Sequence, residues 1–170
     1  RMESHSQFTR RRFLSRTQKV GLSLAATAVF SEAAPAASQS PNEKFTLAMV
    51  GIRGRGALHS TGFAKRKDCQ IAYLCDPNTR RFSRVRNAVE EEQDKRPTLC
   101  QDFRKMLDDK NVDVLINATP DHWHGLGTIM ACQAGKDVYV EKPMAHNIFE
   151  GRKMVEAARK YKRVVQVGMQ

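Results

Sequence analysis

Short apolar runs alternate with helical patterns along most of this chain, and that alternation limits its possible folds more than any other feature. The predicted strands are 44–50, 70–75, 99–100, 112–118, 138–140 and 163–167. The predicted helices follow the glycine-rich turn at 51–56 and cover 79–94, 102–107, 122–133 and 148–161. Strands that are apolar on both faces and separated by helices indicate a parallel sheet covered on both sides. We therefore predict an α/β fold, a doubly wound parallel sheet with right-handed crossovers.

The helix at 148–161 has apolar side chains that we expect to form its buried stripe. They are Ile148, Met154, Val155 and Ala158. Gly135 follows the preceding helix, at the position where a glycine commonly ends one.

The first forty residues have a different composition from the rest. They carry six basic and two acidic side chains, and so hold +4 of the formal net charge of +11. A basic stretch precedes an apolar run at 20–30 and small residues at 33–38, as in an export signal that is cleaved, here after Ala36. Residues 9–14 (TRRRFL) are similar to a bacterial twin-arginine signal. We predict a twin-arginine export signal at 1–37, a linker at 38–43 and a dinucleotide-binding domain at 44–170; the alternative for 1–37 is a basic tail.

Composition excludes several classes of protein. With 41% hydrophobic residues the chain can form a packed core, so a wholly disordered chain is excluded. No apolar run reaches the roughly 18 residues of a membrane-spanning helix. Basic residues are spread over the predicted helices without an aromatic platform, so we expect no nucleic-acid partner. The four cysteines lack zinc-type spacing; disulfides remain possible, but Cys75 and Cys132 are expected to be small buried hydrophobes.

A glycine-rich turn, GIRGRG at 51–56, follows the first strand. Gly51 and Gly56 match the first and third glycines of the G-x-G-x-x-G dinucleotide motif, whereas Arg53 occupies the second place. We expect the backbone at Gly54 to approach a pyrophosphate, with Arg53 and Arg55 contacting phosphate or stacking on adenine. The alternative is an ordinary glycine turn.

An acidic residue, Asp76, ends the second strand 20 residues after Gly56. At about this separation a carboxylate accepts hydrogen bonds from the adenosine ribose. A carboxylate also repels a 2′-phosphate, which favours NAD, although the nearby Arg80 and Arg81 leave NADP possible. The alternative role of Asp76 is to cap a helix.

Two polar segments, 119–124 and 141–143, follow later strands, at the edge where parallel sheets bind ligands. His122 and His124 could ligate a metal together with Asp121 or His146. Because histidines at a helix N-terminus are more often structural, we predict no metal. A lone lysine such as Lys142 is, on its own, most simply a solvated side chain.

Taken together, the segments GIRGRG, CDPN, ATPDHWH, CQAGKDVYVEKP and VVQVGMQ resemble the Gfo/Idh/MocA oxidoreductases over residues 45–170. The subgroup that is most similar is the exported, twin-arginine type of planctomycete-like bacteria. The resemblance implies that Lys142 assists proton transfer during hydride transfer, that Glu141 holds the nicotinamide ribose and that Pro143 shapes the ring pocket.

The same resemblance implies cofactor contacts from the segment at 119–124. Thr119 and Pro120 would line the adenosine and pyrophosphate side, and His124 would approach the nicotinamide half.

The resemblance implies an NAD(P)-dependent oxidoreductase that transfers hydride between nicotinamide and the hydroxyl of a sugar, cyclitol or related molecule. Family members continue into a substrate domain, so we expect this chain to be the cofactor half, inactive by itself, in a periplasmic enzyme that can form homo-oligomers. One alternative is an NAD-dependent glycosidase of the same family. Another is a non-catalytic dinucleotide-binding module.

Overall fold

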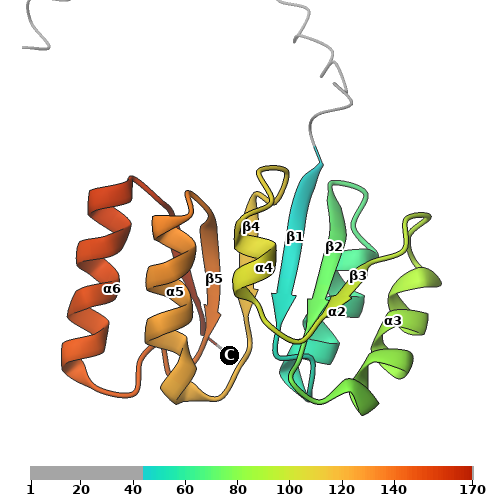
Figure 1. Ribbon diagram of the computed structural model, residues 1–170, viewed down its shortest axis with the longest axis horizontal. Coiled ribbons are helices and arrows are strands. Elements are labelled where there is room, and N and C mark those ends of the chain that lie inside the picture. Colours follow the sequence, from blue (N-terminus) through green and yellow to red (C-terminus); the bar gives the residue numbers. More distant parts are fainter. Residues whose placement is uncertain (1–43, 170) are drawn as a thin grey trace, which may run out of the picture. The chain divides into compact units, whose positions relative to one another are not determined.

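The computed structural model describes residues 44–169, so the predicted export signal (1–37) and linker (38–43) lie outside the described residues. One parallel sheet of six strands forms the centre of this part of the chain (Figure 1). The strands are β1 (Phe45–Val50), β2 (Cys69–Cys75), β3 (Thr98–Cys100), β4 (Val114–Asn117), β5 (Asp137–Glu141) and β6 (Val165–Gly168). The helices are α2 (Arg55–Ala64), α3 (Phe82–Glu90), α4 (Arg104–Leu107), α5 (His124–Gln133) and α6 (Ile148–Tyr161), with 3-10 turns at Thr79–Arg81 and Asp121–Trp123.

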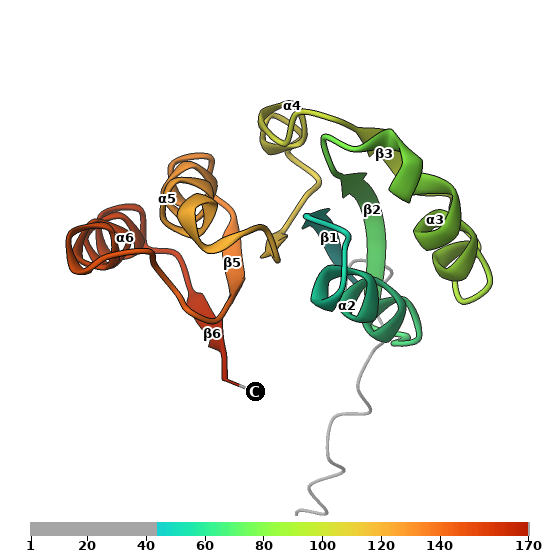
Figure 2. The same cartoon turned by 90° about the horizontal axis from the view of Figure 1, so that it is seen from below.

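The strand order is β3-β2-β1-β4-β5-β6, and every pair is parallel. The chain moves outward from β1 to β3, returns through α4 and then moves outward in the other direction. Figure 2 shows α2 and α3 on one face and α4, α5 and α6 on the other. The predicted doubly wound parallel sheet is confirmed. Its order reverses between β1 and β4, where open parallel sheets form a crevice at the carboxyl ends of their strands.

Side chains of each central strand are buried in two separate cores. Along β1, Leu47 and Met49 pack in the core beneath α2 and α3. Ala48 and Val50 pack in the opposite core, beneath α4, α5 and α6. Because both faces are covered, the strands are continuous apolar runs rather than alternating patterns.

Helix α6 buries a different stripe from the predicted one. Met154 and Ala157 are buried, with Ala158 packed beside them, whereas Ile148 is 80% and Val155 42% exposed. Ile148 and Val155 are seven residues apart and share a face of the helix, but this face is turned about 100° from the one that carries Met154. The prediction that Ile148 and Val155 are buried is therefore wrong.

Other predicted elements are confirmed with small shifts of their ends. The predicted helix at 79–94 is divided, because Asn78 caps a 3-10 turn and accepts a hydrogen bond from the Arg80 amide before α3 begins. Gly135 has a φ of 76°, as a helix-ending glycine requires. Cys75 and Cys132 are buried free thiols, as predicted. Within residues 44–169 no helix is both long and apolar enough to cross a membrane.

We predict a large difference in stability between two substitutions on α6. Met154→Ala removes a side chain that is 2% exposed and should lower the free energy of unfolding by about 2–5 kcal/mol. Ile148→Ala, the matched control on the same helix, should change it by less than about 0.5 kcal/mol. Chemical denaturation followed by circular dichroism measures both. Equal losses would contradict the packing of α6.

Candidate functional site

The glycine-rich turn after β1 is packed tightly against backbone. A Cβ on Gly51, which has a φ of 76°, would lie 2.6 Å from the carbonyl oxygen of Ala118. A Cβ on Gly56 would lie 1.7 Å from the carbonyl oxygen of Gly51. Only glycine fits at these two positions, which are the first and third glycines of the motif.

Gly54 is glycine for another reason. Its φ is 48°, and a Cβ there would have no atom within 4 Å, so the backbone borders open space. Gly54 is also the N-cap of α2, and it has no side chain that could accept hydrogen bonds from the first-turn amides. These amides and the helix dipole favour an anion at this point. The neighbouring Arg53 and Arg55 are exposed and add positive charge.

Asp76 holds the turn in place from the end of β2. Its Oδ2 accepts a hydrogen bond from the Ile52 amide at 3.2 Å, and its Oδ1 accepts one from the Asn78 amide at 2.9 Å. The Nε of Arg81 lies 3.8 Å from Oδ1. Asp76 is only 6% exposed, so the carboxylate is a buried organiser of the turn as well as a candidate ribose ligand.

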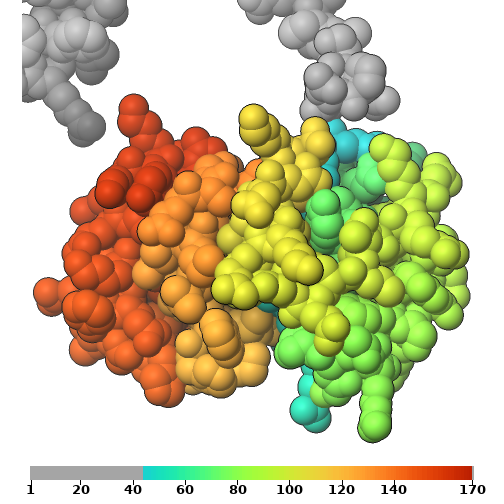
Figure 3. Space-filling model, in the orientation of Figure 1, coloured from blue at the N-terminus to red at the C-terminus, as the bar shows by residue number. Residues whose placement is uncertain are grey.

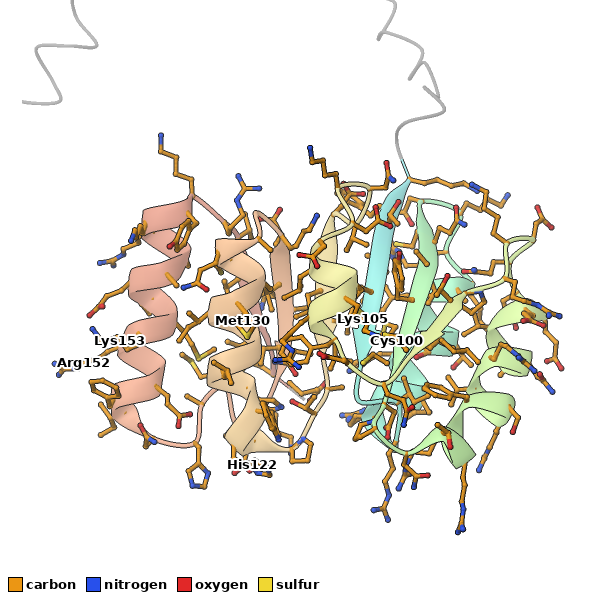
Figure 4. All side chains as sticks on the ribbon, in the orientation of Figure 1. Cys100, Lys105, His122, Met130, Arg152 and Lys153 are labelled. Atoms are coloured by element: carbon orange, nitrogen blue, oxygen red, sulfur yellow. The ribbon has the colours of Figure 1, made fainter. Side chains whose placement is uncertain are left out.

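A cleft of about 870 Å³ lies along the carboxyl ends of β1, β2 and β4. The predicted site residues that line it are Gly51, Arg53, Asp76, Thr119 and Pro120. Its wall also includes residues 102–104 before and at the start of α4, and Trp123, Leu126 and Met130 around α5. Figure 3 shows the yellow α4 region between the orange α5 region and the green α3 region, and Figure 4 labels Met130 on α5. The cleft therefore lies at the point where the strand order reverses.

Asn117, which the sequence analysis did not select, organises one wall of the cleft. Its side chain is buried, and its Oδ1 accepts a hydrogen bond of 2.7 Å from the Thr119 hydroxyl. Its Nδ2 donates to the carbonyl oxygen of His124. A polar residue at the end of the apolar run at 112–118 was the only sequence signal for this role.

His124 is buried between two loops, and its expected approach to the nicotinamide half stays a prediction. The side chain is buried, with Nδ1 2.6 Å from the carbonyl oxygen of Pro143 and Nε2 2.8 Å from that of Thr119. Both ring nitrogens therefore contact backbone, and the ring joins the loop after β4 to the loop after β5 instead of facing the cleft. The same contacts prevent His122 and His124 from acting as a pair of metal ligands.

Exposed polar residues surround the start of α5. His146 Nδ1 lies 3.2 Å from Asp121 Oδ2, and this hydrogen bond lowers the pKa of the Asp121 carboxyl. His122 is close to the same carboxylate and lies at the carboxyl end of the sheet (Figure 4). Among residues 44–169 no three His, Cys, Asp or Glu side chains are arranged to hold a metal ion.

The segment at 141–143 ends β5 with one buried and two exposed residues. Lys142 and Pro143 are exposed and are joined by a cis peptide bond. Glu141 is buried; its Oε1 lies 2.5 Å from Nε2 of His59, and its Oε2 accepts a hydrogen bond from the Lys142 amide. Each carboxylate oxygen thus has one protein partner, and the expected contact of Glu141 with the nicotinamide ribose stays a prediction. His59, on α2, was not selected from the sequence.

Electrostatic effects on Glu141 oppose one another. Burial by itself would raise the pKa of its carboxyl, but the hydrogen bond with His59 and the charge of Arg55 act in the other direction. They outweigh burial, and the pKa is lowered from its ordinary value. The carboxylate is thus kept ionised inside the protein.

Comparison with known proteins gives one family match, to the family described as "Oxidoreductase family, NAD-binding Rossmann fold", over residues 45–169. Glycosyl hydrolase family 109 protein 2 of Shewanella sp. (strain ANA-3) is 33% identical over 113 residues, which are 64% of this chain and 24% of that protein. The WlbA dehydrogenase from Bordetella pertussis, solved in complex with NADH and UDP-GlcNAcA, is 29% identical with a TM-score of 0.61, covering 74% of this chain and 35% of that one.

Myo-inositol 2-dehydrogenase from Lactobacillus plantarum has a TM-score of 0.66 at 20% identity, covering 74% of this chain and 36% of that one, and shares the fold. The chain therefore matches about a quarter to a third of the length of these relatives.

We predict an acid-dependent contribution of Glu141 to stability. Since its pKa is lowered on folding, ionised Glu141 stabilises the protein above the unfolded-state pKa of about 4.3, and this contribution disappears as the pH falls through the lower folded-state pKa. Glu141→Gln should cost about 1 kcal/mol at pH 7, because it weakens a charged hydrogen bond. The difference between the two proteins should shrink between about pH 5 and pH 3 in denaturation experiments. A difference that grows in acid would contradict the assignment.

Proposed function

The chain belongs to the Gfo/Idh/MocA oxidoreductase family, and from this premise we propose that its cleft binds the dinucleotide used in hydride transfer to or from a sugar-like hydroxyl. The observation that carries the proposal is that the glycine-rich turn, through Gly51 and Arg53, and Asp76 line one cleft, with the uncapped start of α2 next along the chain. A pyrophosphate fits here because the helix start has no side-chain cap, Gly54 has no Cβ, and Arg53 and Arg55 add positive charge.

Other residues that line the cleft are proposed to contact the cofactor. Asp76 would accept hydrogen bonds from the adenosine ribose, and Thr119 and Pro120 would border the adenosine and pyrophosphate side. Arg81, beside Asp76, offers a cation that could meet a 2′-phosphate, so NAD is the favoured cofactor and NADP an accepted one. The bound dinucleotide would supply the hydride acceptor.

Lys142 is the residue we assign to proton transfer. It is exposed at the carboxyl end of β5, where its Nζ can reach a substrate hydroxyl and take up or return that proton. A positively charged nicotinamide ring nearby would favour the neutral amine, which can act as a base. Pro143 would border the ring. In the WlbA structure the second ligand is a nucleotide sugar, which supports a sugar-type substrate.

A second candidate function is NAD-dependent glycoside cleavage. The relative from Shewanella, named as a glycosyl hydrolase, is the specific observation in its favour. The test uses an enzyme that includes its substrate domain. Formation of one NADH for each substrate molecule consumed would identify a dehydrogenase. Release of sugar without net NADH would identify a glycosidase.

Export remains a proposal that rests on residues 1–37 alone. We propose that this segment directs the folded protein through the twin-arginine machinery to the periplasm. This route suits a protein that acquires its dinucleotide in the cytoplasm. Assembly into a homo-oligomer is likewise proposed for the whole enzyme.

We predict selective binding of dinucleotides by calorimetry on the full chain. NAD+ should bind with a Kd below about 1 mM. Asp76→Asn should weaken NAD+ about tenfold, because it removes a charged acceptor from the ribose, and should weaken NADP+ less.

Arg81→Ala is the matched control for this experiment. It should weaken NADP+ more than NAD+, because Arg81 is the cation beside Asp76, where the 2′-phosphate of NADP+ would lie. Folded protein that binds neither dinucleotide would exclude the proposed function.

A further inference from the structure

We propose that His59 is a positioning residue for Lys142 and acts through the buried carboxylate of Glu141. The proposal rests on the cofactor-binding function above and adds a residue that connects the two ends of the cofactor site. His59 lies one turn into α2, the helix that begins at the glycine-rich turn. Glu141 is the last residue of β5, directly before Lys142.

The contact between the two side chains is short and shielded from water. Nε2 of His59 lies 2.5 Å from Oε1 of Glu141, and their side chains are only 12% and 6% exposed. In such surroundings a charge-assisted hydrogen bond is stronger than at the surface. The contact links α2 to β5. These elements are not neighbours in the sheet, because β1 and β4 lie between β2 and β5.

Aromatic neighbours restrict the orientation of the His59 ring. The ring of Tyr139 meets it edge-on, with centroids 5.3 Å apart and an interplanar angle of 71°. The ring of Phe63, one turn further along α2, has its centroid 6.1 Å from that of the His59 ring. Gly168 closes the site, because a Cβ there would lie 3.1 Å from Oε1 of Glu141 and 2.5 Å from the Tyr139 hydroxyl. His59 therefore has little freedom to leave Glu141.

Glu141 transmits this constraint to the backbone of Lys142. Its second oxygen, Oε2, accepts a hydrogen bond from the Lys142 amide at 3.3 Å. On the other side of Lys142, the carbonyl oxygen of Pro143 contacts Nδ1 of His124 at 2.6 Å. The exposed lysine thus projects from a backbone segment that is held on one side by Glu141, the partner of the partly buried His59, and on the other by the buried His124.

Loss of the His59 contact has a specific consequence for this segment. A buried carboxylate without its partner is unfavourable, so Glu141 would turn toward water and release the Lys142 amide. The turn at 141–143 would then lose its fixed position relative to the glycine-rich turn. The nicotinamide half of a dinucleotide would be affected, whereas the adenosine diphosphate half, bound at the other end, would not.

Two substitutions at position 59 separate positioning from general stabilisation. The amide nitrogen of His59→Gln lies at about the position of the imidazole Nε2 and can still donate to Glu141. The shorter His59→Asn cannot reach it. Both remove the ring and its aromatic contacts, so they differ mainly in the hydrogen bond.

The experiment measures the affinities of NAD+ and ADP for the full chain by calorimetry. His59→Asn should weaken NAD+ about tenfold and change ADP by less than about twofold. His59→Gln should restore most of the affinity for NAD+. Amide hydrogen exchange at Lys142 should be faster in His59→Asn than in the wild-type protein and the Gln variant.

Each other outcome has a distinct meaning. Unchanged NAD+ affinity in folded His59→Asn, equal losses for NAD+ and ADP, or no recovery in His59→Gln would overturn the positioning role while leaving cofactor binding intact. Wild-type protein that binds neither NAD+ nor ADP would instead overturn the proposed function. If His59→Asn does not fold, Glu141→Gln replaces it: faster amide exchange at Lys142 together with a lower affinity for NAD+ and unchanged ADP supports the proposal, and unchanged exchange at Lys142 overturns it.

Discussion

The close contact between the turn after β1 and the backbone after β4 is the constraint on which the site depends. Gly51 lies so close to Ala118 that any side chain would collide with its carbonyl group. This approach is possible because β1 pairs in parallel with β4 as well as with β2, so three strand ends meet at one edge. The cleft, the exposed start of α2 and the position of Asp76 all follow from that meeting.

Polar contacts hold two parts of the candidate site in different ways. At the carboxyl end of β2, Asp76 binds backbone amides of two neighbouring segments and so fixes the glycine-rich turn. At the carboxyl end of β5, His59, through Glu141, and His124 hold the residues on either side of Lys142. In both places a buried polar side chain fixes a loop, and the groups left exposed are the ones available for ligands.

The fold could be predicted from the sequence because it depends on local patterns. Apolar runs bounded by helices identify the strands, and glycine spacing with Asp76 identifies the turn and its partner. The buried face of α6 was not predictable in the same way, since Met154 and Ile148 belong to two apolar stripes and only packing selects one. His59 and Asn117 were missed because their roles depend on partners distant in sequence or on backbone groups, for which residue type alone carries no signal.

The candidate site combines buried carboxylates with an exposed lysine, the residue proposed to transfer a proton. Asp76 and Glu141 are buried, whereas Lys142 and Pro143 face solvent at the carboxyl end of β5. Of the residues proposed to act on the cofactor or substrate, the two carboxylates are therefore part of the packed domain, whereas Lys142, Pro143, Arg53 and Arg55 are accessible. The matched relatives extend well beyond the region aligned with this chain. The contacts that fix the glycine-rich turn come from Asp76 and do not involve Lys142 or Pro143, so the two proposed functions make the same demand on this turn.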